Sequence, residues 1–445
     1  MGEDRKEAQF RKMTGERIPG LILSLAVPTI VSMIVTAIYN TADTYFVSKL
    51  GTSASGAVGI VMSLMGLIQS LGFMIGMGSG SWMSRLLGEK KDETASGVAA
   101  SGFYFSLVLG LLVAVMGCCF LDPLVGLLGA TETIRPYARE YAQYILYASP
   151  FLIASFTMNK MLCAEGKARF AMIGIASGGV LNMFLDPIFI FGLKLGIAGA
   201  AIATGLSQIV GFCILLYMFV SGRTIADLRW KNASRHIGMY VRIIESGLPS
   251  FFRQGLASVA TIALNWMAAG YGDAAVSAMA IVSKVFMLIF SVLIGFGQGY
   301  QPVAGYNYGA KRYDRVREAF LFMSVSATVF MAICAVPGYL AAPHLIRLFI
   351  GNDADVVRIG TQALRFQCLT MALLPLNICC NMTFQTIGRT GLATFLSTAR
   401  QGYVFFPAIF LLPHFLGLTG VEAAQPVADA VAFLIGIPYT VRFLR

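Results

Sequence analysis

The chain has 445 residues, of which 57% are hydrophobic and only 12% are charged, and its mean hydropathy is +0.73. Soluble domains carry nearer ~25% charged residues, so this composition excludes a soluble protein and predicts an all-α polytopic membrane protein. The formal net charge of +11 is typical of basic cytoplasmic loops, so we expect no nucleic-acid partner.

Apolar runs of about 20 residues recur along the chain, and each is long enough to cross a bilayer as a helix. They predict twelve transmembrane helices, at 20–46, 56–82, 96–119, 137–159, 169–191, 198–221, 246–269, 276–301, 318–339, 361–385, 393–414 and 421–441. The basic segment before the first run lacks the apolar core and cleavage site of a signal peptide, so we expect no processing.

Lysine and arginine are far more frequent in one alternate set of loops than in the other. The rich set includes both terminal segments, because an even number of spans returns the chain to its starting side. Cytoplasmic loops of membrane proteins carry an excess of Lys and Arg. The pattern therefore predicts that both termini are cytoplasmic.

The longest polar stretch, 222–245, divides the chain into an N-terminal lobe, 1–221, and a C-terminal lobe, 246–445. Each lobe contains six predicted spans, and a basic cytoplasmic tail precedes the first. The dividing stretch is basic and amphipathic, so we expect it to lie along the cytoplasmic membrane interface as a linker.

The two lobes repeat each other in sequence. The matched pairs, 221 residues apart, include Pro28 with Pro249, Gly51 with Gly272, and Gly88 with Gly309. Because each repeat has six spans, both enter the membrane from the same side and are parallel. Parallel repeats of this kind are one plan of transporters that rock two lobes around a central cavity.

Two carboxylates lie inside predicted spans of the first lobe, Asp43 and Asp186. Asn182 shares a helix face with Asp186, and Pro187 frees the carbonyl group of Met183 from the helix ladder. A charge in mid-membrane costs about 3 kcal/mol or more and is functional by default. The alternative is an aspartate at a helix end, near the lipid headgroups.

The same positions of the second lobe are apolar, and Arg253 and Arg400 are found in that lobe instead. We therefore expect the working carboxylates to be confined to the first lobe. A structural motif should recur in both repeats, whereas a chemical one need not. The asymmetry favours Asp43 and Asp186 as a functional pair.

The combination of motifs resembles the multidrug and toxic compound extrusion (MATE) family. The motifs are N-x-x-x-D-P at 182–187, G-x-x-G-A-A-x-A-T at 196–204, and D-T-x-x-V-x-x-L-G at 43–51. The resemblance covers essentially the whole chain, and GLPSFFRQ (247–254) with STARQG (397–402) is most similar to the bacterial MepA-like branch. It implies the MATE fold, twelve helices in two parallel six-helix repeats, in a bacterial inner membrane.

The resemblance implies export of bulky, often cationic, amphipathic drugs, driven by inward flow of protons or sodium ions. The family's cation site, which would take H⁺ or Na⁺, maps onto Asp43, Asn182, Asp186 and Thr204. The proline whose kink is linked to cation binding maps onto Pro28. Some members carry an acid in span 7, where this chain has Arg253 and Gln254, so coupling through the second lobe is not expected.

A substrate cavity is expected between the lobes, with aromatic and methionine walls that suit flat or cationic compounds. The candidate residues are Tyr39, Asn40, Gln69, Arg253, Trp266, Met287, Gln298 and Arg400. Core or lipid-facing packing is the alternative for each, and the two arginines could instead pair with acids or reach the headgroups. Lys284 is interpreted as structural, and Asp429 has no assigned role.

A lipid-linked glycan flippase of a related superfamily is the alternative function. It would need a more cationic central cavity, and the Asn182–Asp186 motif argues against it. An enzyme is not expected, because no HExxH, GxSxG, Walker or paired-histidine motif occurs. We expect no cofactor beyond the coupling ion, no disulfide or metal cluster from the cysteines, and a monomer whose partners are drugs or organic cations and membrane lipid.

Overall fold

The computed structural model describes residues 3–350 and 353–444, and every regular element in these ranges is a helix. Helices satisfy the backbone hydrogen bonds of an apolar chain without help from water, as a lipid environment requires. Lobe one contains α1 (Glu3–Gly15), α2 (Ile18–Ser48), α3 (Thr52–Gly88), α4 (Asp92–Cys119), α5 (Leu121–Leu127), α6 (Arg135–Ala164), α7 (Ala168–Pro187), the π-helical turn η1 (Ile188–Gly192) and α8 (Gly196–Val220).

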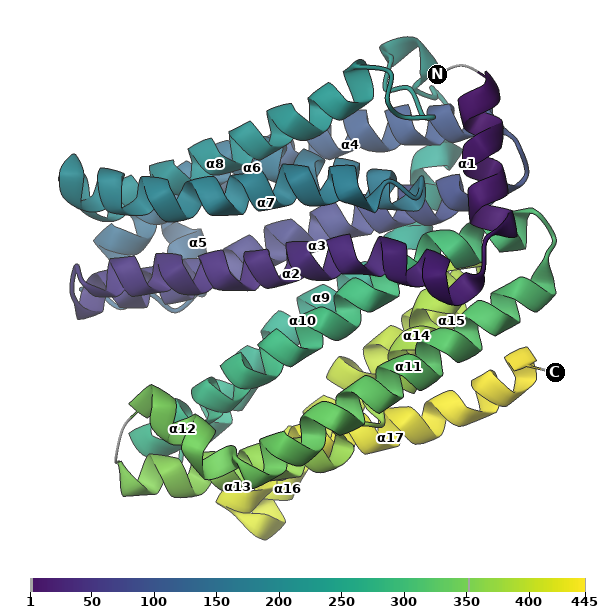
Figure 1. Ribbon diagram of the computed structural model, residues 1–445. Coiled ribbons are helices and arrows are strands. Elements are labelled where there is room, and N and C mark those ends of the chain that lie inside the picture. The colour runs from purple at the N-terminus through teal and green to yellow at the C-terminus, as the bar shows by residue number, and fades with distance from the viewer. Residues whose placement is uncertain (1–2, 351–352, 445) are drawn as a thin grey trace.

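A short 3-10 helix, η2 (Trp230–Asn232), lies between the lobes in the sequence. Lobe two contains α9 (Ile237–Ala269), α10 (Asp273–Gly309), α11 (Tyr313–Leu340), α12 (Ala342–Ile350), α13 (Ala354–Met371), α14 (Leu374–Thr386), α15 (Thr390–Thr398), the π-helical turn η3 (Ala399–Tyr403), α16 (Phe405–Leu416) and α17 (Leu418–Leu444). The two bundles meet at the end where both termini lie and diverge toward the other end (Figure 1).

The twelve predicted spans all correspond to helices. In the described residues, nine helical segments are long and apolar enough to cross a membrane, and α13 with α14 forms a tenth that is bent by 55°. The more polar α6 and α9 have 30 and 33 residues, which is also enough to span a bilayer. The helices extend a few residues beyond the predicted limits, because apolar composition marks the lipid-buried part only.

The repeat seen in the sequence is also a repeat of the backbone. Left-handed backbone conformations fall at corresponding places in the two lobes, at Gly51 and Gly272, Lys90 and Lys311, Gly166 and Gly388, and Gly196 and Gly417. Each pair lies at the connection between equivalent helices. The two lobes therefore share one chain path through six spans.

The lobes touch through their backbones at the end where the termini lie. A Cβ atom at Gly78 of α3 would lie 2.0 Å from the carbonyl oxygen of Ile243 in α9. One at Gly309 of α10 would lie 2.0 Å from the carbonyl oxygen of Arg85 in α3. Only a residue without a side chain permits such an approach, so these glycines set how closely the lobes join.

Helix α2 packs along α10 of the opposite lobe. Cβ atoms at Gly295 and Gly299 would lie 2.6 and 2.5 Å from the Cα atoms of Ile30 and Ala26. Thr29 Oγ1 donates a hydrogen bond of 2.6 Å to the carbonyl oxygen of Gly295. Pro28 lies buried between these contacts, so the proline of span 1 is located where α2 joins the second lobe.

The N-terminal tail forms a helix that was not predicted from the sequence. Gln9 of α1 donates to the carbonyl oxygen of Glu165 in lobe one at 2.8 Å. Asn307 of lobe two donates to the carbonyl oxygen of Met13 at 3.0 Å. Helix α1 therefore contacts both lobes at the end where they join (Figure 1).

The part of the predicted linker before Ile237 is bound to lobe one, and the rest of it, residues 237–245, belongs to α9. The backbone N–H groups of Ile225 and Ala226 donate to the carboxylate of Glu165 at 2.9 and 2.8 Å. Tyr104 donates to the carbonyl oxygen of Leu228 at 3.0 Å, and Ser101 accepts from the backbone of Ser234 at 2.9 Å. These bonds fix an irregular chain that has no regular ladder of its own.

Gly78→Ala should destabilise the protein by about 1–3 kcal/mol, because the new methyl group would overlap the α9 backbone and force the lobes apart. The measurement is the thermal unfolding midpoint of the purified protein in detergent. Gly59→Ala is the matched control, since a Cβ atom at Gly59 of the same helix would meet nothing within 4 Å. Equal midpoints for the two variants would contradict the role given to the close contact.

Candidate functional site

Helices α7 and α8 bring three of the predicted cation-site residues together. Asn182 Nδ2 donates to Asp186 Oδ1 at 3.0 Å and to Thr204 Oγ1 at 3.3 Å. All three side chains are buried. Asn182 and Asp186 lie one turn apart on α7, and the helix changes to the π-helical turn η1 directly after Pro187. The i, i+4 spacing of Asn182 and Asp186 therefore brings an amide and a carboxylate within hydrogen-bond distance, and the hydroxyl of Thr204 joins them from α8.

Asp43 reaches the same site from α2. Tyr141 of α6 donates a hydrogen bond of 3.1 Å from its hydroxyl to Asp43 Oδ2. Asp43 also lies close enough to Asp186 for the two carboxyl groups to interact electrostatically. Tyr141 was not among the predicted residues, because nothing in its own stretch of sequence marks it and only the packing of α6 against α7 and α8 brings it to the site.

Three oxygen atoms of this site have no hydrogen-bond partner in the described residues: Asp43 Oδ1, Asn182 Oδ1 and Asp186 Oδ2. A buried oxygen without a donor is costly, so a native structure that keeps three of them together requires an explanation. Carboxylate, amide and hydroxyl oxygens are the ligands that hard cations take, and a carboxylate can also carry a proton. The residues present therefore fit either a small cation or a proton.

A cavity of about 470 Å³ lies between the lobes. Its wall is formed by α2, α3 and α6 of lobe one and by α9, α10, α13, η3, α16 and α17 of lobe two. The candidate residues that line it are Asn40, Gln69, Arg253, Met287 and Arg400, together with Lys284. Phenylalanine side chains at 286 and 290 stack on each other in the same wall, with ring centroids 5.6 Å apart.

The other three candidates lie elsewhere. Tyr39 is buried inside lobe one against Gly179 of α7. Trp266 is 69% exposed, contacts Phe410 edge to face and is not part of the cavity wall. Gln298 is buried and accepts a hydrogen bond of 2.8 Å from Lys160. Their helices were identified, but which face of each helix points to the cavity depends on packing that composition does not report.

Lobe two also contains buried carboxyl groups, because α17 carries two buried acids. Asp429 Oδ1 accepts from Arg400 Nε at 2.6 Å and from Gln425 at 2.9 Å. Asp429 Oδ2 accepts from Gln367 of α13 at 2.8 Å. Asp429, unassigned in the sequence, is therefore the counterion of Arg400.

Glu422, the second acid of α17, is 3% exposed and lines the cavity. Its Oε2 atom has no hydrogen-bond partner in the part of the chain that the structure describes. Glu422 was not among the predicted residues, although a signal was present. Glu422, Gln425 and Asp429 are spaced i, i+3 and i+7 and so form one polar face of an otherwise apolar helix.

Arg253 lies in α9 in the cavity wall, and its partners are neutral. Its Nη1 atom donates to Asn381 Oδ1 at 2.8 Å, and Nη2 donates to Ser250 Oγ at 3.4 Å. In the described residues no carboxylate lies within ion-pair distance of it. The two arginines thus differ, because Arg400 is neutralised within lobe two and Arg253 is not.

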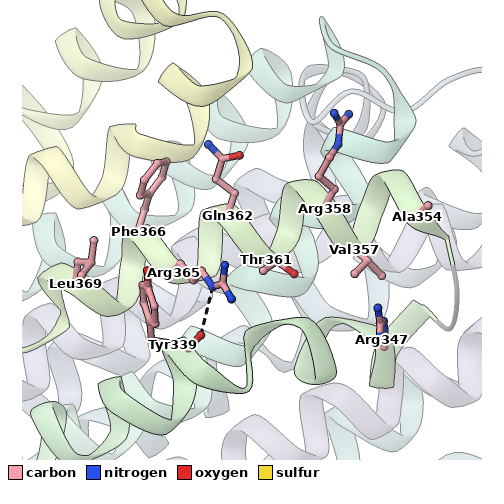
Figure 2. Close-up of a pocket in the computed structure, with 10 residues that line it drawn as sticks. All are labelled: Tyr339, Arg347, Ala354, Val357, Arg358, Thr361, Gln362, Arg365, Phe366 and Leu369. Carbon is pink, nitrogen blue, oxygen red and sulfur yellow. Dashed lines mark hydrogen bonds between the residues drawn. The ribbon is translucent and has the colours of Figure 1, made fainter.

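A second hollow, of about 780 Å³, lies on lobe two between α11, α12 and α13 (Figure 2). Arg365 donates to the carbonyl oxygen of Tyr339 there at 3.4 Å, and Arg358 pairs with Asp355. All of its lining residues belong to lobe two. It therefore cannot be the space around which two lobes move.

Comparisons with known proteins agree with this arrangement. The sequence model of the MatE family matches the chain twice, at residues 28–188 and 249–410, once in each lobe. A curated relative, the multidrug export protein MepA of Staphylococcus haemolyticus (strain JCSC1435), is 29% identical over 95% of this chain and 93% of its own length.

Two solved structures share the fold. A MATE structure in complex with MaL6 has a TM-score of 0.92 at 27% identity and covers 98% of each chain. An outward-facing multidrug resistance MATE family transporter of the MOP superfamily has a TM-score of 0.91 at 28% identity and covers 97% of each chain. With the family match in both lobes and a twelve-span helical fold, the chain belongs to the MATE family of multidrug transporters.

Proposed function

We propose that this chain is an antiporter that exports bulky, often cationic, amphipathic drugs across a bacterial inner membrane in exchange for protons or sodium ions. The observation that carries the proposal is the set of three buried, unpartnered oxygens on Asp43, Asn182 and Asp186. The curated relatives are named multidrug export proteins, which supports the class of cargo.

The cation would act on the two carboxylates of lobe one. Two carboxyl groups close together inside an apolar bundle resist being ionised at the same time, so a proton or a sodium ion stabilises the pair. Tyr141 holds Asp43 in place by its hydrogen bond, and Asn182 orients Asp186 and Thr204 in the same way. When the cation leaves, the repulsion between the carboxylates returns and the packing of α2 against α7 becomes less favourable.

Helix α2 is the element that would pass this change to the cargo. Asp43 belongs to the cation site, and Asn40, one turn earlier on α2, lines the central cavity. The same helix is in backbone contact with α10 of lobe two through Gly295 and Gly299. If cation and cargo favour different positions of α2, each weakens the binding of the other, which is the antagonism that exchange requires.

Lobe two is not expected to bind the coupling ion. Its most enclosed acid, Asp429, already has the guanidinium group of Arg400 as a permanent cation. A free cation would have to displace a charged group that is tethered to the chain. Coupling is therefore assigned to lobe one.

Arg253 favours a second candidate function, a lipid-linked glycan flippase. Its charge faces the cavity without a carboxylate partner among the described residues, as a site for pyrophosphate would require. The comparison that separates the two functions is dye efflux against lipid flipping in proteoliposomes. Transfer of a lipid-linked phosphate without dye efflux would replace the first proposal with this one.

Asp43→Asn and Asp186→Asn should each reduce gradient-driven ethidium efflux at least about tenfold, because an amide can neither carry the proton nor supply the charge that holds a sodium ion. Efflux is measured in vesicles under an imposed pH gradient and then an imposed sodium gradient, and the gradient that drives wild-type efflux identifies the ion. Asp355→Asn is the control, since Asp355 is exposed in lobe two. Normal efflux by both site variants would reject the proposal.

Arg400→Gln should destabilise the folded protein by about 3 kcal/mol or more, because it leaves the buried Asp429 carboxylate without its charged partner. The double variant Arg400→Met, Asp429→Leu should recover most of this loss, as replacement of a whole buried ion pair by apolar groups often does. Thermal unfolding in detergent measures both. An Arg400→Gln protein as stable as wild type would mean that Asp429 remains free to bind a cation.

A further inference from the structure

The central cavity contains a carboxylate that the proposed cation exchange does not use. Glu422 is 3% exposed, and its Oε2 atom lacks a partner in the described residues. Of the basic groups near it, Arg400 is engaged by Asp429 at 2.6 Å, and Arg358, which interacts with Glu422 beyond ion-pair distance, pairs with Asp355. The charge of Glu422 is therefore left facing the cavity.

The cavity that Glu422 lines also contains a second unpartnered hydrogen-bond acceptor and aromatic side chains. Gln401 of η3 lines the same cavity, and its Oε1 atom is also without a partner in the described residues. Phe286 and Phe290 of α10 line the same cavity, and the guanidinium group of Arg400 lies over both rings, 5.9 and 4.9 Å from their centroids. Unpartnered acceptor oxygens suit a positively charged nitrogen on the cargo, and aromatic walls suit the apolar part of such a molecule.

We propose that Glu422 binds the positive charge of the exported cargo and so determines which compounds enter the central cavity. This inference rests on the proposed export function and names the residue in it that selects cationic cargo. Glu422 faces a cavity of about 470 Å³, which is large enough for a drug-sized ring system, whereas the oxygens of lobe one converge on a single point.

The net charge of the wall restricts the cargo further. Arg253 and Lys284 also line the cavity, and neither is paired with a carboxylate in the described residues. Glu422 can offset a single positive charge that lies directly beside it, although the wall as a whole carries more basic than acidic groups. A second positive charge would be repelled by the basic groups, so the cavity should favour monocations over dications.

The test is dye binding to the full-length purified protein in detergent, measured by fluorescence anisotropy without any ion gradient. The probes are ethidium, a monocation, propidium, a dication with the same ring system, and Nile red, which is neutral. Glu422→Gln keeps the size and shape of the side chain and removes its charge. Glu140→Gln is the matched control, because Glu140 is exposed on α6.

In Glu422→Gln we expect the Kd for ethidium to rise at least about tenfold, while the Kd for Nile red changes less than about twofold. Wild type should bind propidium more weakly than ethidium. Unchanged ethidium binding in Glu422→Gln would overturn the inference, and so would an equal loss of Nile red binding, which would indicate a role in cavity shape. Equal or tighter propidium binding would overturn the preference for monocations.

The outcome for the proposed function is read separately, from gradient-driven efflux by wild-type protein in vesicles. Efflux that persists in wild type while ethidium binding is unaffected by Glu422→Gln rejects only the role of Glu422. Wild-type protein that shows neither dye binding nor efflux under either gradient rejects both. A Glu422→Gln protein that binds ethidium normally but loses its response to the gradient would assign Glu422 to coupling instead of cargo.

Discussion

The packing of α2 against α10 is the contact on which the rest of this structure depends. By sequence α2 belongs to lobe one, and it brings Asp43 to the buried oxygens of α7 and α8. By contact it also belongs to lobe two, because Gly295 and Gly299 let the two backbones approach within van der Waals distance. A helix shared in this way cannot change its position in one lobe without a cost in the other, since packed interiors resist continuous deformation.

The two lobes show how one backbone can serve two kinds of chemistry. In lobe one the carboxylates of Asp43 and Asp186 keep unpartnered oxygens, whereas in lobe two the carboxylate of Asp429 is paired with Arg400. Arg400 thus supplies from within the chain the positive charge that the Asp429 carboxylate requires. The two repeats keep the same backbone path. Different residues at a few buried positions, such as Asp186 in one lobe and Asp429 in the other, give the two lobes different chemistry.

Much of the fold follows from physical rules that act along the sequence. The length of apolar runs gave the twelve spans, and the glycine and proline pairs gave the repeat, because membrane thickness and tight turns constrain residue type directly. The Asn182–Asp186 pair could be predicted because both residues lie on one helix. Tyr141 could not, since it meets Asp43 only through the packing of separate helices, and Trp266 was misplaced because apolar sequence does not distinguish a lipid-facing side from a cavity-facing one.

The attachment of the linker to lobe one limits how the two halves can swing. Glu165, Tyr104 and Ser101 together hold the chain as far as Ser234, and α9 begins at Ile237. Only Arg235 and His236 then remain between the bound part of the linker and α9, so bending of this connection is confined to these two residues. Any rotation of lobe two about this connection would therefore be centred close to His236, and the short unbound segment would restrain sliding of one half past the other.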